Sequence, residues 1–154
     1  MADYSGYTRT NYFKVTNEDA LFKLIDECGS KDPRGIEIWT FQDEDGSKLY
    51  AFASESDLLG LPIVNDDNNR SEEDDCVHEL DFDYDDFIRE LQKLLPDGEA
   101  VLITNIGKEK LCYLHGDMHV VTNKQTVRKS LHSIGIETAR TLLDNAKWDT
   151  KNEY

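Results

Sequence analysis

The sequence predicts an α+β fold, a single domain in which a mostly antiparallel sheet carries about three helices packed on one face. Three observations lead to this prediction. The 154 residues correspond to one domain with a sizeable core. The 38% of hydrophobic residues come in periodic clusters, which favours a folded chain over a disordered one. Strand-like segments follow one another through turn signals, with amphipathic segments between only some of them.

The expected organisation is one folded unit with flexible ends. We predict a flexible N-terminus at 1–8, a single α+β domain over 9–147 and a polar tail at 148–154. Between 55 and 79 the apolar residues lose their periodicity, so a long acidic loop is predicted inside the domain.

The first half of the chain predicts a strand, a helix and a hairpin. The segment NYFKV at 11–15 has strand composition, and Thr16 with Asp19 resembles a capping box that starts a helix. The helix is predicted from the spacing of Leu21, Leu24, Ile25 and Cys28. GIEIWTFQ and SKLYAFAS then form a hairpin that turns at Asp45-Gly46. Its large apolar surface is expected from Trp39, Phe41, Tyr50 and Phe52.

A second helix is predicted from about Asp83 to Pro96. Asp83 is the expected N-cap, and Phe82 and Phe87 have the spacing of a hydrophobic staple. The breaker run Pro96-Asp97-Gly98 ends the helix. The apolar face is expected from Phe87, Ile88, Leu91, Leu94 and Leu95.

The last third predicts short strands and a final helix. AVLITNI at 100–106 reads as a central strand joined through Gly107-Lys108-Glu109 to a strand at 110–116. Further short strands are expected in MHVVTN and TVRKSLHS. A helix from about Ile136 to Asn145 follows. Its inward side chains are expected to be Ile136, Ala139, Leu142, Leu143 and Ala146.

The net charge of −15 is concentrated in one region of the chain. Residues 1–42 carry five basic and seven acidic residues, residues 43–99 carry four and nineteen, and residues 100–154 carry eight and six, so the three sums are −2, −15 and +2. Such a field repels nucleic acid and anionic membranes and attracts basic protein surfaces. We therefore expect a basic protein partner, without direct nucleic-acid or membrane binding. The oligomeric state stays open at this stage.

The stretch from 65 to 86 holds eleven acidic residues among twenty-two, and they divide into two groups. Asp83, Asp85 and Asp86 suit the start of a helix, where carboxylates face the positive end of the dipole. The others form the candidate partner-binding set: Asp66, Asp67, Glu72, Glu73, Asp74, Asp75, Glu79 and Asp81. They form either a solvated loop or a patch that imitates nucleic acid, whose duplex carries one charge per about 1.7 Å of axis.

A metal site is the strongest chemical alternative. Cys112, His115 and His119 have a C-x2-H-x3-H spacing, and His78 or His132 could complete four zinc ligands. Alternation along a strand puts Cys112 and His115 on opposite faces, which argues for a buried thiol and hairpin histidines instead. For calcium, Glu72 occupies the position where a loop starting at Asp67 needs glycine. We therefore predict no metal and no cofactor.

Catalysis is not the favoured interpretation either. The sequence contains neither GxxxxGK[ST] nor GxGxxG, so support for nucleotide chemistry is lacking. Cys76 and His78 are neighbours, but the carboxylates of Asp74, Asp75 and Glu79 oppose a thiolate there. The many paired carboxylates do not single out one pair. We predict that the protein is not an enzyme and has no catalytic residues.

Composition also predicts a compartment. Cys28, Cys76 and Cys112 are an odd number at irregular spacing, which favours a reducing environment over a disulfide framework. No stretch approaches 18 apolar residues, and MADYSGYTRT is not a leader. The cytoplasm is therefore the expected location.

Three phrases resemble a group of small acidic proteins, largely uncharacterised, that is associated with bacterial plasmids, conjugative elements and prophages. They are RTNYFKVTNED at 9–19, DFDYDDFIRELQKLLPDGEA at 81–100 and GKEKLCYL at 107–114. The group brings no catalytic or binding residue to this chain. Because mobile elements often encode acidic inhibitors of host defence, some of them DNA mimics, the resemblance implies an anti-restriction or anti-CRISPR role.

The leading hypothesis is a small acidic, non-enzymatic binding protein that inhibits a basic nucleic-acid-handling protein of host restriction or CRISPR defence. One alternative is an immunity or antitoxin-type protein that neutralises a basic toxin. The other is a zinc-stabilised domain or metal enzyme that uses Cys112, His115 and His119.

Overall fold

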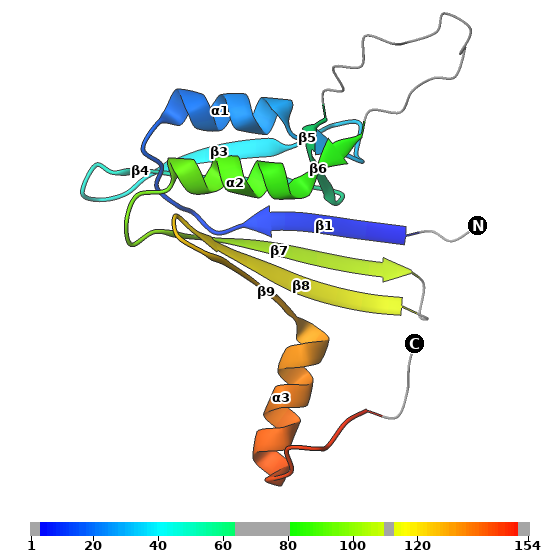
Figure 1. The fold of residues 1–154 in the computed structure, drawn as a ribbon. Helices are drawn as coiled ribbons and strands as arrows, with labels where there is room; N and C mark the ends of the chain where they lie inside the picture. The colour runs from blue at the N-terminus through cyan, green and yellow to red at the C-terminus, as the bar shows by residue number, and fades with distance from the viewer. Residues whose placement is uncertain (1–3, 64–80, 110–112, 151–154) are drawn as a thin grey trace, which may run out of the picture.

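The computed structural model describes residues 4–63, 81–109 and 113–150, and within them it confirms the α+β fold class. Nine strands and three helices are found in these ranges. The strands are β1 Tyr4–Thr10, β2 Gly29–Ser30, β3 Glu37–Gln42, β4 Lys48–Ser54, β5 Leu58–Pro62, β6 Phe82–Asp83, β7 Ala100–Glu109, β8 Tyr113–Thr122 and β9 Thr126–Ser130. The helices are α1 Glu18–Glu27, α2 Tyr84–Leu94 and α3 Leu131–Leu143. Their arrangement is drawn in Figure 1.

Six strands form the main sheet in the order β3-β4-β1-β7-β8-β9, and every pairing is antiparallel. β1 lies inside this sheet, between β4 and β7, so the flexible N-terminus expected at 1–8 is wrong for residues 4–8. Seven residue pairs tie β1 to β7, from Tyr4 opposite Glu109 to Thr10 opposite Ile103. The strand expected at 11–15 is reduced to one bridge, in which Phe13 exchanges backbone hydrogen bonds with Tyr50.

Helices α1 and α2 form because their apolar residues repeat with helical spacing and their N-caps supply a side-chain acceptor. The cap of α1 is Asn17, which accepts from the Ala20 amide at 3.1 Å, and not Thr16 as the sequence pattern indicated. Asp83 caps α2 as expected, accepting from the Asp86 amide at 3.2 Å. Such a cap stabilises a helix by about 1 kcal/mol.

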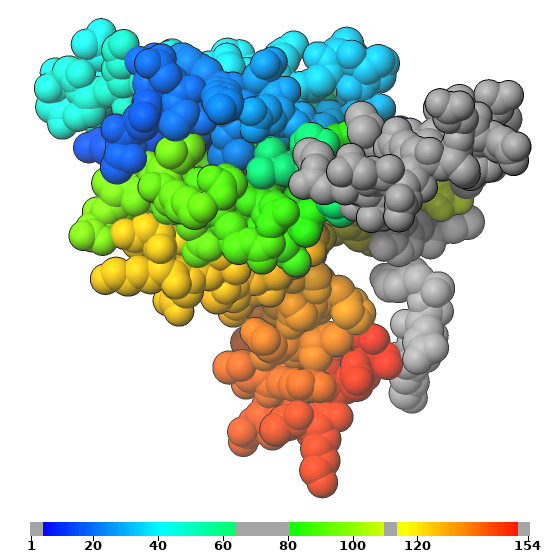
Figure 2. Space-filling view, turned by 45° about the horizontal axis from the view of Figure 1, so that its top comes forward, coloured from blue at the N-terminus to red at the C-terminus, as the bar shows by residue number. Residues whose placement is uncertain are grey.

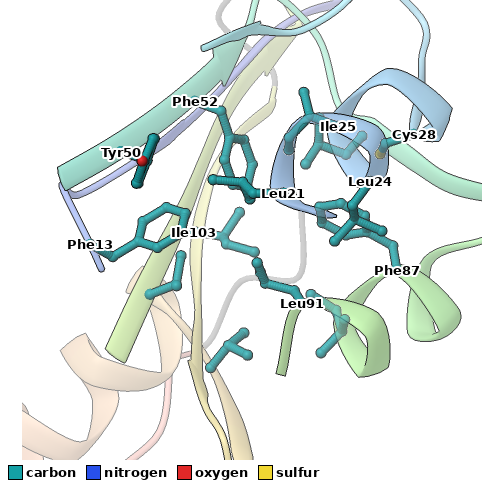
Figure 3. Packing of buried hydrophobic residues seen from close by; sticks show 14 of the residues in the cluster. Phe13, Leu21, Leu24, Ile25, Cys28, Tyr50, Phe52, Phe87, Leu91 and Ile103 are labelled. Carbon is teal, nitrogen blue, oxygen red and sulfur yellow. The ribbon is translucent and has the colours of Figure 1, made fainter. Parts of the chain in front are cut away.

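Both helices bury their apolar faces on the same side of the main sheet, as Figure 3 shows. Phe52 of β4 has no exposed surface and meets two other buried rings edge-on, Phe13 at 6.0 Å and Phe87 at 6.1 Å between centroids. Such ring pairs add about 0.5–1.5 kcal/mol beyond burial. The core cluster also includes Leu21, Leu24, Ile25, Ile88, Leu91, Leu95, Val101, Ile103 and Val121.

A second, three-stranded sheet lies at one end of the helix layer, in the order β2-β5-β6. Because β5 occupies Leu58–Pro62, this part of the long loop expected at 55–79 is a strand, while residues 64–79 of that loop lie outside the described residues. Its apolar residues do not alternate visibly in the sequence, yet Leu58 and Gly60 are buried. The sheet connects the end of α1 to the start of α2, since β2 follows α1 directly and β6 precedes α2.

The strands β7 and β8 are longer than predicted. They pair over ten positions, from Ala100 opposite Thr122 to Glu109 opposite Tyr113. β7 therefore runs through Gly107-Lys108-Glu109, the residues expected to turn, because the cross-strand hydrogen bonds extend to Glu109. The two short strands predicted at 110–116 and 118–123 belong to one continuous strand from Tyr113 to Thr122.

Helix α3 starts at Leu131, five residues before the predicted start, and has no buried side chain. Ser130 and Ser133 form a capping box that begins the helix directly after β9. The expected inward face is wrong, since Leu142 is 81% exposed and Leu143 is 56% exposed. Figures 1 and 2 show α3 extending beyond the sheet and not joining the layer formed by α1 and α2.

The side of the main sheet opposite α1 and α2, here called the open face, exposes large apolar side chains. Strand alternation and the register place them there: Tyr7, Trp39, Phe41, Ile106, Leu114 and Val127. Trp39 and Phe41 were expected to supply the large apolar surface of the hairpin together with Tyr50 and Phe52. They point to the other side because they pair with Ala51 and Leu49, which alternate with the buried rings along β4.

The packing described for the core predicts a clear difference between two isoleucines. We expect Ile103→Ala, at a position with no exposed surface, to lower the free energy of unfolding by about 2–5 kcal/mol through loss of buried area and an unfilled cavity. The control Ile63→Ala removes the same atoms from a side chain that is 42% exposed, and its cost should stay below about 1 kcal/mol. Urea unfolding measures both, and equal losses would contradict the core as described.

Candidate functional site

The acidic segment 64–80 leaves and rejoins the described structure at one place, the β5–β6 pair. Leu61 and Pro62 of β5 lie opposite Asp83 and Phe82 of β6, and the amide of Ile63 donates to the carbonyl of Asp81 at 2.7 Å. Of the predicted partner-binding residues, Asp81 is therefore placed here, with an exposed side chain. The others lie outside the described residues: Asp66, Asp67, Glu72, Glu73, Asp74, Asp75 and Glu79.

Two helix ends bring further carboxylates to this place. The chain enters α2 at Asp83 and leaves α1 at Glu27, and the small sheet holds these two points together. We call the surface formed here the acidic end. It consists of Asp26, Glu27, Asp81, Asp85 and Asp86.

The carboxylates of the acidic end differ in what they contribute to folding. Asp85 and Asp86 lie in the first turn of α2, where the helix dipole stabilises negative charge by about 0.3–1 kcal/mol each. Asp26 and Glu27 lie in the last turn of α1, where the same dipole opposes negative charge and no basic residue shares the turn. Their position is therefore not explained by helix stability.

Basic side chains near the acidic end neutralise only part of it. Arg89 pairs with Asp86 one turn along α2, and Lys23 approaches Glu27 at 3.9 Å with both side chains more than half exposed. Exposed pairs of this kind contribute about 0–1 kcal/mol and leave the field largely in place.

A close backbone approach fixes the geometry of the acidic end. Gly60 of β5 has φ +102°, and a Cβ placed on it would lie 2.3 Å from the carbonyl oxygen of Asp83. The ring of Phe82 lies over Gly29, where a Cβ would be 2.5 Å from the ring. Only glycine allows β5 to approach the start of α2 so closely.

A group of titratable side chains, of which His119 is buried and Tyr84 is half-buried, lies between α2 and β8. The hydroxyl of Tyr84 and Nδ1 of His119 are 3.1 Å apart, and their rings are 5.7 Å apart. Arg128 of β9 lies 5.8 Å from the Tyr84 ring and 3.8 Å from Asp117. Burial raises the pKa of Tyr84 to about 12. Burial, and then the positive charge of Arg128, lower the pKa of His119 below its usual 6.5.

Polar side chains continue from this group across the covered face of the sheet. In register, Ser54, Thr8, Asn105 and Asp117 lie side by side on β4, β1, β7 and β8. Thr8 donates to the Asn105 amide oxygen at 2.7 Å, and the Asn105 amide nitrogen donates to Asp117 at 3.0 Å. Because each member finds a partner, this row orders the sheet and does not present a free reactive group.

The two candidate zinc ligands that the structure describes on β8, His115 and His119, do not lie close together. His115 and His119 lie on one straight strand four residues apart, which separates them by about 13 Å. One zinc ion binds its nitrogen ligands at about 2.0–2.1 Å, so these two cannot share it. Cys112 and His78 lie outside the described residues. Within the part of the chain that the structure describes, no three histidine, cysteine or acidic side chains form a group suited to a metal.

A pocket of about 290 Å³ lies where the open face meets the end of β4. Arg9 lies 5.3 Å from the centre of the Trp39 ring on its wall. Arg34 forms ion pairs with Asp32 and Glu55 there. Arg34 is thus paired with two carboxylates, and the pocket is a hollow of mixed aromatic and charged lining.

Comparison of the chain with models of protein families, with curated proteins and with solved structures finds no match. Among the described residues, no helix has both the length and the apolar character needed to cross a bilayer.

Sequence reasoning missed Asp26 and Glu27 as members of the acidic end. They are 39 or more positions before Asp66, and only the small sheet, which links the end of α1 to the start of α2, places them at this end of the molecule. One signal was available in the sequence. Two acidic residues end an otherwise ordinary amphipathic helix, where basic residues are favoured.

The approach at Gly60 predicts a large effect of one methyl group. Gly60→Ala should lower the free energy of unfolding by more than about 2 kcal/mol, because the new Cβ would collide with the backbone of Asp83 in addition to straining φ. The matched control is Gly98→Ala, where φ is +83° and the space is open, so only the strain of about 1 kcal/mol remains. Thermal unfolding that ranks the two variants equally would contradict the close approach.

The burial of His119 predicts a pH dependence. Its folded pKa is lowered, so its neutral form contributes stability that is fully present above the unfolded pKa of about 6.5 and is lost as the pH falls towards the folded pKa. His119→Gln should therefore show a smaller loss of stability than the wild type between about pH 7 and pH 5, by urea unfolding. His132→Gln, at an exposed position on α3, is the control and should follow the wild type. Identical curves for all three proteins would contradict the assignment.

Proposed function

We propose that this protein is a non-enzymatic binding protein whose acidic end, together with the adjoining acidic segment, occupies the basic surface of a nucleic-acid-handling partner. A restriction or CRISPR enzyme is the proposed target, on the strength of the resemblance to acidic proteins of mobile elements. The observation that carries the proposal is the placement of Asp26 and Glu27 at the dipole end that disfavours them, where the small sheet links the end of α1 to the start of α2.

The arrangement fits binding to a basic surface better than it fits folding. Carboxylates from the end of α1, from Asp81 just before β6 and from the start of α2 come from separate parts of the sequence, and the small sheet β2-β5-β6 links these three places. Like charges gathered in this way repel one another and lower stability, so their retention favours a partner that neutralises them. A cationic groove built for phosphates has the complementary field.

The proposal predicts that partner binding depends on this end and not on charge in general. The test variant is Asp26→Asn, Glu27→Gln and Asp81→Asn. The control is Asp43→Asn, Glu44→Gln and Asp45→Asn in the β3–β4 turn, which removes the same charges at the other end of the sheet. Partners captured from the native host's lysate should bind the test variant about tenfold more weakly and the control almost normally.

Two further readouts accompany the capture. About 0.5 M salt should weaken the complex strongly, because screening then acts over a few ångströms. The protein should also displace a labelled DNA duplex from the captured partner. A complex that resists salt, or equal losses in both variants, would remove the acidic end as the binding surface. A captured basic toxin would instead support the immunity-protein alternative.

A further inference from the structure

The open face is unusual for the solvent side of an antiparallel sheet, which normally carries polar residues. Its large side chains include Tyr7, Phe41 and Ile106, which are 56%, 51% and 52% exposed. Helix α3 adds Leu131, Leu142 and Leu143 from the edge of the same sheet. At about 100 Å² for each partly exposed apolar side chain, the six on the open face amount to about 600 Å², and the three on α3 add about 300 Å² beyond the sheet edge. The open face alone therefore reaches the upper end of the largest patches on ordinary monomers, about 300–600 Å².

From these observations we propose that a second copy of this chain covers the open face, forming a two-fold symmetric dimer. The apolar area matches this partner, because a stable interface buries about 800 Å² on each side. The charge matches as well. In a chain of net charge −15, the open face is close to neutral, with Arg9, Lys108 and Lys129 against Glu37 and Glu55.

The register of the sheet makes the open face complementary to itself. One row runs straight across the six strands: Glu37, Ala53, Arg9, Thr104, Met118 and Lys129. It begins with an acid on the edge strand β3 and ends with a base on the other edge strand, β9. Let the two-fold axis lie between the two sheets, parallel to the strands and above the gap between β1 and β7. Glu37 of each copy then faces Lys129 of the other copy, so the dimer contains this pair twice. The strands then align as in common sheet-on-sheet packing.

Helix α3 fits the same arrangement. It follows β9 without a linker, and its direction is held by the Ser130–Ser133 capping box and by Leu131, which packs on Gly116 of the open face. Leu142 and Leu143 of α3 therefore cannot pack against the sheet of their own chain. With β3 of the second copy lying over β9, α3 begins beyond the Glu37 end of that strand, on the side away from Trp39 and Phe41.

The high charge does not oppose this dimer. In each copy α1 and α2 lie on the outer side of the sheet, so the two acidic ends are separated by both sheets, about 30 Å in all. This distance is several times the screening length of about 8–10 Å at physiological salt. The dimer would thus present two acidic ends without bringing them into contact.

Sedimentation velocity tests the proposal on the intact protein. The protein is measured over about two decades of concentration near micromolar. At the high end the wild type should sediment with twice the 17.7 kDa mass of one chain, and the dimer should dissociate on dilution. Ile106→Glu should raise the dimer dissociation constant by about 100-fold. Ile63→Glu is the control, 42% exposed on a different surface, and should leave it unchanged. A wild type that stays at the mass of one chain would overturn the dimer and leave the open face to a different protein.

A charge exchange tests the orientation. Glu37→Lys or Lys129→Glu alone should weaken the dimer by about fivefold to tenfold, and the combination should restore it to within about twofold. If the combined variant does not regain the affinity of the wild-type dimer, the two-fold axis parallel to the strands is wrong. Leu142→Glu with Leu143→Glu should weaken the dimer by about tenfold, and no effect would remove α3 from the interface. Far-UV circular dichroism and thermal unfolding confirm that each variant is folded.

Discussion

The packing of Phe52 between Phe13 and Phe87 ties the main sheet to its helix layer, and the other features of the molecule depend on it. Phe52 belongs to β4, Phe13 follows β1 and Phe87 belongs to α2, so two edge-to-face contacts join three distant parts of the chain. This packing holds α1 and α2 on one side of the sheet. It leaves the other side open, and it directs the end of α1 and the start of α2 towards the same small sheet.

The acidic end illustrates how a tertiary contact changes the meaning of charge. Asp85 and Asp86 stabilise the helix that carries them, while Asp26 and Glu27 act against theirs. The close approach of Gly60 to Asp83 fixes β5 against the start of α2, and the small sheet links this start to the end of α1. A basic partner would recover the energy that this crowding costs, which is the physical basis of the proposed binding function.

The two proposed surfaces are independent of each other. The acidic end lies at the termini of the helix layer, whereas the open face lies on the opposite side of the sheet and is nearly neutral. A dimer built on the open face would leave both acidic ends accessible. Two such ends on one particle would raise the effective affinity for a partner that offers two basic sites, through the high local concentration of the second.

Sequence patterns determined the elements of this protein better than their connections. The helical spacing of Leu21, Leu24 and Ile25, and that of Phe87, Ile88 and Leu91, correctly identified two buried faces, because a single amphipathic helix carries its whole signal locally. The Asp83 cap and the Asp45-Gly46 turn were found for the same reason. The concentration of charge in residues 43–99 is likewise a property of the sequence alone.

Only the tertiary structure decided where these parts lie. Tyr4–Thr10 is polar enough to resemble a tail, and it is a strand because β4 and β7 satisfy its backbone on both sides. Leu142 and Leu143 repeat as if they faced a core, yet α3 leaves the sheet at its edge and no core is present there. The position of Asp26 and Glu27 at the end of the molecule where α2 starts depends on the small sheet β2-β5-β6. Local patterns record which face of an element is apolar, but the partner that covers that face is a property of the whole fold.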